Sequence, residues 1–473
     1  MDNTFFFVDG IEPDRESKRL MRRHVMKGKN AGKTFHRRSR PGLASRQSNT
    51  TLAPSSSSLY LSRHLDKQTS RWDWGCLPTN AIGRNLGSVL FTCSLPVKVT
   101  TTSQKIIHQF FNFTADRIYP VRLGISLDDA KYMWLRVLFS DEATYQCNIS
   151  LMAASNEVFL GGGDSSPKAF YHLSRTLSLV QKRLERPDAL SDSTIGIVLS
   201  LISHESIRQE HASAKVHVDG LRRMVELRGG LSQLEGNIPL LLKVCKTDII
   251  FAIQHGGPTI FFRDSMPQVQ VLLSSKGLSL DRASAASSVQ HGGLEPYLHE
   301  ILLDVISTSS LFNNKLHMHS VGLVAFQEML VSICYRLLRL HPLDEPRQAS
   351  DIQTVYHIGL TIFMMTLFLQ YNRHQIMDHK LVSFCFKDVL VRGSFEHESE
   401  LMLWFMFIGG IWVSGDVDTY WVVPRIRATL QQLGIKTWDE AQSSLRKFPW
   451  INVLHDQPGR ELWDRTDQVY EIP

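Results

Sequence analysis

The stretch HVDGLRRMVELRGGL, residues 217–231, predicts an amphipathic helix that ends at a pair of glycines. Its apolar residues recur with the period of an α-helix, and charged residues occupy the opposite side. The apolar side comprises Val216, Leu221, Met224, Val225 and Leu227. Glycine adopts the left-handed conformation that closes many helices at little steric cost. We therefore expect the helix to stop at Gly229 and Gly230.

A second amphipathic helix follows in LLLKVCKTDIIFAIQHGGPTIFF, residues 240–262. Its apolar side comprises Leu241, Val244, Cys245, Ile249, Ala252 and Ile253. The run HGGP at 255–258 is expected to end it, because glycine and proline interrupt helices. Two helices around a glycine hinge, within residues 195–262, therefore form the centre of the predicted fold.

Asp248 is the one acidic residue on the apolar side of the second helix. A buried carboxylate needs a partner, because transfer of an unpaired charge out of water is costly. Lys246 is too near in sequence to face it. We therefore predict that Asp248 pairs with a basic residue such as Arg228, as a structural clamp rather than as a ligand site.

The rest of the chain favours an all-α, multi-helical fold with one large domain over residues 59–473. Helical spacing recurs along it, and strand alternation is confined to a short piece at 89–99. Helices are expected at 103–119, 131–160, 167–184, 191–205, 294–309, 320–340, 352–371, 380–391, 398–414, 416–433 and 437–447. Residues 264–295 are rich in Ser and Gly, which predicts a loop-rich insertion.

Two uncharged runs, at 354–372 and 401–415, are long enough to raise the question of a membrane span. The first contains His, Thr and Gln, and the second is short and includes two glycines. A spanning helix needs about 20 predominantly apolar residues. Buried core helices are therefore predicted, and no membrane contact is expected.

Positive charge is concentrated in a segment near the amino terminus. The formal net charge is +6, yet residues 15–46 alone hold twelve Lys or Arg and one acid, so the remainder carries −5. Residues 39–58 are rich in Ser, Pro, Gly and Thr, and such a composition predicts a disordered linker. Residues 1–58 are thus expected to form a basic, largely disordered arm.

The basic residues of this arm suit nuclear import or contact with nucleic-acid phosphates. They are Arg22, Arg23, Lys27, Lys29, Lys33, Arg37, Arg38 and Arg40. Phosphate contacts give affinity without sequence information, so any DNA contact through the arm would be nonspecific. The third interpretation of these basic residues, besides nuclear import and nucleic-acid contact, is a solvated tail that binds no ligand.

Several of these segments resemble one known family, the fungal-specific transcription factor domain in its second form. The signature positions are Gly220, Leu221, Met224, Val225, Arg228, Gly229, Gly230, Leu231 and Asp248. FFFVDGIEPDRESKRLMRRHVMK, at 5–27, resembles the opening of a subgroup that lacks the zinc binuclear cluster. WDEAQSSLRKFPWINVLHDQPGRELWD, at 438–464, resembles its usual close.

The resemblance implies a nuclear transcriptional regulator whose helical body dimerises, senses an effector or contacts other regulators. The zinc cluster that usually precedes this domain needs six thiolates, with two C-x2-C pairs. Here residues 1–75 contain no cysteine, and the six cysteines of the chain are scattered. A missing upstream exon would produce the same absence, although the segment from Met1 resembles a natural start. Direct sequence-specific DNA binding is therefore not expected.

A metal site at His204, Glu205 and His211 is disfavoured by its spacing. The metalloprotease motif places two histidines four residues apart, whereas these two are seven apart. A solvated helix face explains the three side chains better. No metal and no cofactor is predicted.

Two short patterns resemble parts of enzyme motifs. Gly161–Gly163 lacks the strand and the lysine of a phosphate loop, and Ser444 to Lys447 matches S-x-x-K without its companion motifs. We therefore predict that the protein is not an enzyme. The alternative functions are a helical interaction scaffold that binds no nucleic acid and an enzyme whose site has no recognisable motif.

Overall fold

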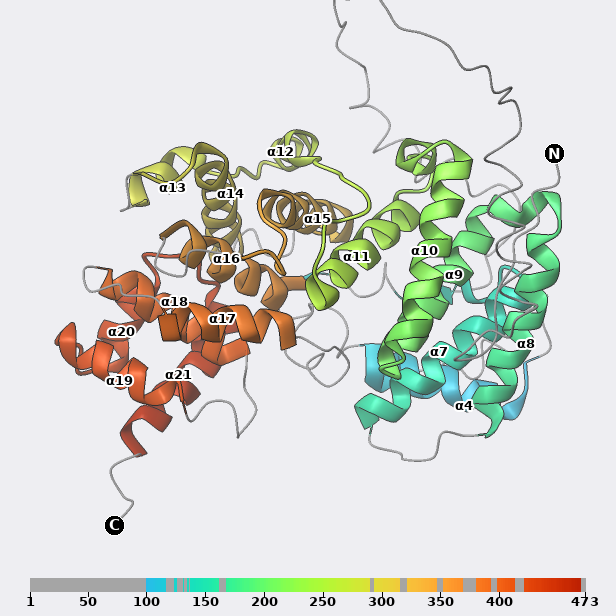
Figure 1. The fold of residues 1–473 in the computed structure, drawn as a ribbon, viewed down its shortest axis with the longest axis horizontal. Coiled ribbons are helices and arrows are strands. Elements are labelled where there is room, and N and C mark those ends of the chain that lie inside the picture. Colours follow the sequence, from blue (N-terminus) through green and yellow to red (C-terminus); the bar gives the residue numbers. More distant parts are fainter. Residues whose placement is uncertain are drawn as a thin grey trace, which may run out of the picture.

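The computed structural model describes residues 99–468, except for 116–122, 126–130, 132–133, 136, 161–166, 290–292, 315–320, 347–351, 369–379, 393–397 and 413–420. All regular elements in these residues are helices, which confirms the predicted all-α class (Figure 1). The predictions for the basic arm, for Gly161–Gly163 and for nearly all of 89–99 fall outside the described residues.

The first group of helices is built on α7 and α9, and α9 packs between α7 and α10 (Figure 1). Its members are α4 (Thr101–Gln109), the π-helix η3 (Phe110–Thr114), α7 (Glu142–Leu160), α8 (Pro167–Leu184), the 3-10 helix η5 (Pro187–Leu190), α9 (Asp192–Ile207) and α10 (His211–Arg228). A short 3-10 helix, η6 (Leu231–Leu234), then leads to α11 (Ile238–His255). Helix α11 connects the two halves, because it packs against α9 on one side and α15 and α17 on the other.

The second group follows α11 and contains the most apolar helices. Its members are α12 (Met266–Ser275), α13 (Arg282–Ser288), α14 (Pro296–Asn313), α15 (Leu323–Leu340), α16 (Ile352–Phe368), α17 (Lys380–Arg392), α18 (Ser399–Trp412), α19 (Val423–Gln432), α20 (Trp438–Leu445) and α21 (Asn452–Gln468). One continuous apolar core extends from α9 to α21.

The two central helices end where the glycines predict. Gly229, with a φ of 104°, closes α10, and Gly256 closes α11. The apolar side of α10 differs at two positions from the prediction: Val216 is 50% exposed and Leu227 is only half-buried, while Ala214 and Val218 are buried. Val216 lies five residues from Leu221, about 140° around the helix, and therefore faces away from the core.

The expectation of a loop-rich insertion at 264–295 is wrong, because this segment contains α12 and α13. Pro267 stands in the first turn of α12, where no intrahelical N–H is needed. Asp281 caps α13 by accepting the N–H of Ser284. Met266 and Leu273 are buried in the main core. Proline and aspartate, which are common in loops, here mark the starts of helices.

The last helix, α21, extends past the end of the predicted helices and carries Pro458 in its interior. Interior proline removes one helical hydrogen bond, so a proline in this position normally argues against a helix. Nonetheless α21 packs on α18, α19 and α20. Its apolar contacts with the core, including those of Leu454 and Leu462, stabilise it.

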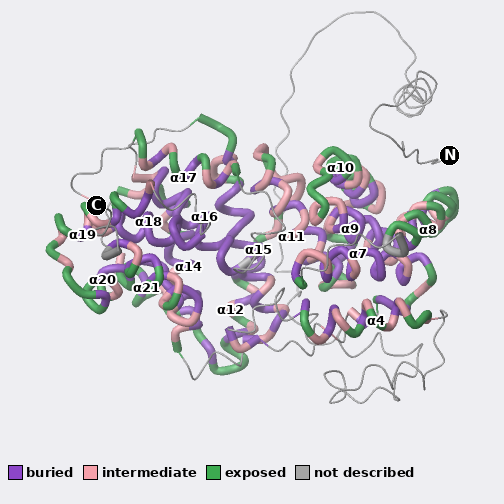
Figure 2. The backbone as a smooth tube through the Cα atoms, turned by 90° about the horizontal axis from the view of Figure 1, so that it is seen from below, coloured by how far each residue is buried: buried purple, intermediate pink, exposed green. Residues whose placement is uncertain are grey.

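The two uncharged runs form the buried centre of the second group. Helices α16 and α18 are buried along nearly their whole described length (Figure 2). Gly409 of α18 allows a close approach by α17, since a Cβ there would lie 2.1 Å from the Phe386 ring. Among the described residues, no helix has both the length and the apolar character to cross a bilayer. The prediction of buried core helices is confirmed.

Candidate functional site: polar networks at the helix ends

Four consecutive residues at the start of α9, Ser191 to Thr194, connect several helix ends. Ser191 caps α9: its Oγ accepts the N–H of Thr194 at 3.3 Å. The next two side chains then bind in two directions. Ser193 reaches the ends of α7 and α8, and Asp192 reaches those of α10 and α11.

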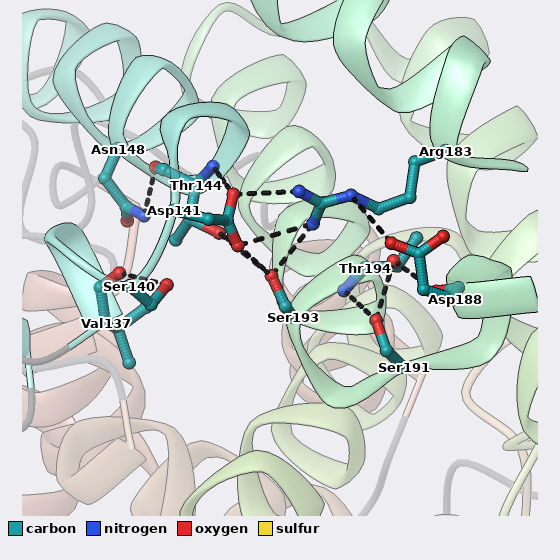
Figure 3. A network of polar contacts seen from close by, with 10 residues as sticks. All are labelled: Val137, Ser140, Asp141, Thr144, Asn148, Arg183, Asp188, Ser191, Ser193 and Thr194. Carbon is teal, nitrogen blue, oxygen red and sulfur yellow. Dashed lines mark hydrogen bonds and ion pairs between the residues drawn. The ribbon is translucent and has the colours of Figure 1, made fainter. Parts of the chain in front are cut away.

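The first of these networks centres on Asp141, the residue before α7 (Figure 3). Its carboxylate accepts the N–H of Thr144 at 2.9 Å, the Oγ–H of Ser193 at 2.5 Å and Nη2 of Arg183 at 2.9 Å. Arg183 also donates to Ser193 Oγ at 2.9 Å. The start of α7, the end of α8 and the start of α9 are thus held by one carboxylate.

Electrostatics keep the Asp141 carboxylate ionised. Burial alone would raise its pKa, but hydrogen bonds from Arg183, Ser193 and the Thr144 amide outweigh that effect. The pKa of Asp141 therefore lies below its ordinary value. The charged form is the one that binds its neighbours in the fold.

The second network joins the signature residue Arg228 to Asp192. Arg228 Nη1 donates to a carboxylate oxygen of Asp192 and, at 3.3 Å, to the carbonyl of Leu190. The other Asp192 oxygen accepts Nδ2 of Asn237 at 2.8 Å, and Asn237 in turn caps α11. The end of α10 and the start of α11 therefore meet the start of α9.

Gly229 and Gly230 allow the chain to turn between these contacts. Their φ angles of 104° and 97° lie in the left-handed region, which favours glycine. The Gly230 N–H donates to the carbonyl of Val225 at 2.9 Å, as in a Schellman ending. The Arg-Gly-Gly part of the signature is thus a junction of three helices.

The prediction that Asp248 pairs with Arg228 is wrong. Its carboxylate accepts the backbone N–H groups of Ile260 at 2.8 Å and Phe261 at 2.9 Å, and the hydroxyl of Tyr335 at 3.0 Å. Backbone amides are partners that residue types alone do not reveal. Asp248 still clamps the fold, but it fixes the segment after α11 onto α15.

Asp248 is only 3% exposed, and this enclosure governs its protonation. Burial raises the pKa of its carboxyl group, while the two amides and the Tyr335 hydroxyl oppose that rise. Burial also raises the pKa of Tyr335 well above its ordinary value. The tyrosine therefore stays protonated, and its hydroxyl donates a hydrogen bond to Asp248.

Helix α15 carries two further buried charged residues that were not predicted from the sequence. Glu328, 3% exposed, binds Arg263 through two bonds of 2.7 and 2.8 Å. Arg336 binds the fully buried Asp304 of α14 at 2.5 Å. Arg282 contacts Asp304 at 2.8 Å. These pairs tie α13, α14 and the segment before α12 to α15.

A signal for these pairs is present in the sequence. Glu328 and Arg336 lie eight residues apart within the largely apolar run LVAFQEMLVSICYRLLRL and so share one side of α15. The partner of Glu328 lies 65 positions away in the sequence, and the partner of Arg336 lies 32 positions away. The sequence therefore indicates that Glu328 and Arg336 are buried charges, but it does not indicate their partners.

Lys243 of α11 is a further charged group directed at α9. Its Nζ donates to Ser200 Oγ at 3.0 Å. Burial lowers the pKa of Lys243 to about 8, and burial raises the pKa of the Cys147 thiol of α7 to about 12. This part of the interior thus favours uncharged groups.

His204, Glu205 and His211, which were considered as metal ligands, do not converge on a common point. His204 Nδ1 lies 3.2 Å from Glu205 Oε1, whereas the ring of His211 packs edge-on against His255. His204 is buried, so the predicted solvated face is wrong for this residue. Within the described part of the chain, no three His, Cys, Asp or Glu side chains are placed to hold a metal ion.

The S-x-x-K match has a structural explanation. Lys447 Nζ binds both carboxylate oxygens of Glu400, at 2.6 and 2.8 Å, and Ser444 donates to the same carboxylate at 3.3 Å. Both side chains therefore fasten α20 to the start of α18. Like the other networks, this one positions helices.

One comparison with known proteins gives a match. The model of the family described as "Fungal specific transcription factor domain" matches residues 105–448. No curated protein gives a significant match, and no solved structure does. The matched region includes the α9 junction, the Asp248 clamp and most of both helix groups. The chain belongs to the fungal specific transcription factor domain family.

Proposed function

We propose that this protein is a nuclear transcriptional regulator whose helical body acts by contacting other regulatory proteins or a second copy of itself. The observation that carries the proposal is the family match over residues 105–448. The basic residues between Arg22 and Arg40 supply nuclear import and a nonspecific attraction to nucleic acid.

The described surface supports contact with proteins. Large apolar side chains are exposed on the first helix group, notably Phe113 at 54%, Phe170 at 45% and Tyr171 at 63%. Exposed aromatic side chains are enriched at protein interfaces, where they lose little conformational entropy on binding. The Asp141–Arg183 pair fixes the end of α8, the helix that carries Tyr171, to the start of α7, and a fixed surface loses less entropy on association.

A tethering experiment tests the regulatory role. The full chain is fused to an unrelated DNA-binding domain, and transcription of a reporter carrying that domain's sites is measured. We expect a change of several-fold relative to the DNA-binding domain alone, and a smaller change for an Asp248→Ala fusion whose body is destabilised. An unchanged reporter, with the folded fusion present in the nucleus, would refute the proposal.

The import role is tested separately by deletion of residues 15–46. Folding of the body should persist, because the deleted residues precede the described helices. The truncated protein should shift from the nucleus to the cytoplasm, as seen by fluorescence microscopy of a tagged chain. A wholly nuclear distribution after deletion would refute import through the basic residues.

A further inference from the structure

The outward side of α17 carries an unusual stripe of exposed residues. Lys380, Phe384, Lys387 and Val391 follow at intervals of four, three and four positions, so they lie along one side of the helix. Phe384 and Val391 are 65% and 60% exposed, the largest values among the large apolar side chains described in the second helix group. We call these four residues the α17 stripe.

Aromatic and basic groups continue beside the stripe, at the start of α19. The Trp421 ring packs on Phe386 of α17, with 5.5 Å between ring centroids. Lys387 Nζ lies 5.6 Å from the centre of the Trp421 ring, and Arg425 Cζ lies 5.8 Å from it. The acid of α17, Asp388, is paired with Arg392. Cations and apolar rings are thus presented together.

A ligand that fits this surface must be both acidic and aromatic. Carboxylates would meet Lys380, Lys387 and Arg425, and apolar side chains would cover Phe384 and Val391. Residues 1–14 of this chain, MDNTFFFVDGIEPD, have this composition: three consecutive phenylalanines, four acids and no Lys or Arg. No other stretch of similar length outside the described residues combines these features.

We propose that residues 1–14 dock on the α17 stripe of the same molecule, with Phe5 to Phe7 over Phe384 and Val391 and the acids toward the lysines. The intervening residues 15–98 can span about 280 Å when extended. The radius of gyration expected for a body of this size is only about 21 Å. The intervening segment is therefore long enough for residues 1–14 to reach α17. Because both sites belong to one chain, their effective concentration is high, and even a weak contact is populated.

Carbodiimide crosslinking of the full-length protein tests this docking, because the reagent joins carboxylates to amines only when they touch. We expect crosslinks from Asp2, Asp9, Glu12 or Asp14 to Lys380 or Lys387, identified by mass spectrometry. A mixture of 15N-labelled and unlabelled protein separates bonds within one molecule from bonds between copies. Docking within the molecule gives crosslinks between peptides of the same label.

Matched serine substitutions establish the role of the exposed ring. Phe384→Ser should lower the yield of these crosslinks about fivefold or more. Phe170→Ser removes a phenylalanine that is 45% exposed on α8 and should leave the yield unchanged. Both sites are exposed, so folding should survive, as circular dichroism would verify.

The proposal is overturned if residues 1–14 give no crosslink to α17, if crosslinks form only between copies, or if Phe384→Ser and Phe170→Ser behave alike. The inference goes beyond the proposed regulatory function and does not depend on it. Its failure would leave the reporter experiment unaffected.

Discussion

Asp248 holds three donors from two segments on its two carboxylate oxygens, at 2.8 to 3.0 Å. A single acid on the apolar side of a helix indicates a buried carboxylate with a partner, and this much was predictable from the sequence. The identity of the partner was not predictable, because nearly every residue has a backbone N–H. Only the path of the chain brings those of Ile260 and Phe261 to Asp248.

Replacement of Asp248 by alanine tests the clamp. The change leaves two buried amides and the Tyr335 hydroxyl without their acceptor, so we expect the free energy of unfolding to fall by about 3 kcal/mol. Urea denaturation measures this value. Asp219→Ala, which removes an exposed pair with Lys215, should change it by less than about 0.5 kcal/mol. Equal effects of the two substitutions would contradict the clamp.

A double-mutant cycle distinguishes the observed partners from the pairing that the sequence suggested. Arg228 binds Asp192 and Asp248 binds other groups, so Arg228→Ala and Asp248→Ala should have additive effects within about 0.5 kcal/mol. Denaturation of the two single variants and the double variant supplies the measurement. A coupling energy above about 1 kcal/mol would restore the direct pair.

The lowered pKa of Lys243 predicts a stability change at alkaline pH. Between pH 8 and about 10.4, the unfolded chain binds more protons at this lysine than the folded protein does. The contribution of Lys243 to stability therefore rises as pH increases through this window, and Lys243→Met should remove that rise. Urea denaturation at pH 7.5, 8.5 and 9.5 measures it. The exposed Lys215→Met variant should retain the wild-type slope, and identical slopes for both variants would contradict the assignment.

At the scale of helices, local signals and distant contacts contributed differently. The ends of α10 and α11 were predicted because glycine's preference for positive φ is a property of one position. The helices α12 and α13 were missed because Pro267 and Asp281 serve equally in loops and in first turns. The α9 junction was invisible in advance, since its bonds join residues up to 52 positions apart.

The turn after α10 gives a prediction with an internal control. Alanine at Gly230 would meet no atom within 4 Å, so only its φ of 97° makes the substitution unfavourable. We expect Gly230→Ala to lower the free energy of unfolding by about 1 to 2 kcal/mol. Gly236 also has open space around its Cβ position and does not have a positive φ. Thermal unfolding of Gly236→Ala should show a much smaller loss, and a similar loss at both positions would argue against backbone strain.

At the scale of the molecule, charge divides the chain into two parts. Residues 15–46 carry a net charge of +11, and the remainder carries −5. The all-α class and the family were both predictable from the sequence, because helical periodicity and the signature around Gly229 are local patterns. The charges of the arm predict counterion release from DNA, which depends on salt and not on base sequence.

DNA binding across a salt series tests the central claim, that the body works through protein contacts and the arm gives only phosphate attraction. The full chain, and a variant with glutamine at the eight basic positions from Arg22 to Arg40, are titrated with random duplex and with a selected-sequence library between 50 and 300 mM salt. We expect binding without sequence preference that falls steeply with salt and disappears in the glutamine variant. Sequence-selective binding that persists in that variant would show that the helical body itself reads DNA and would contradict the account.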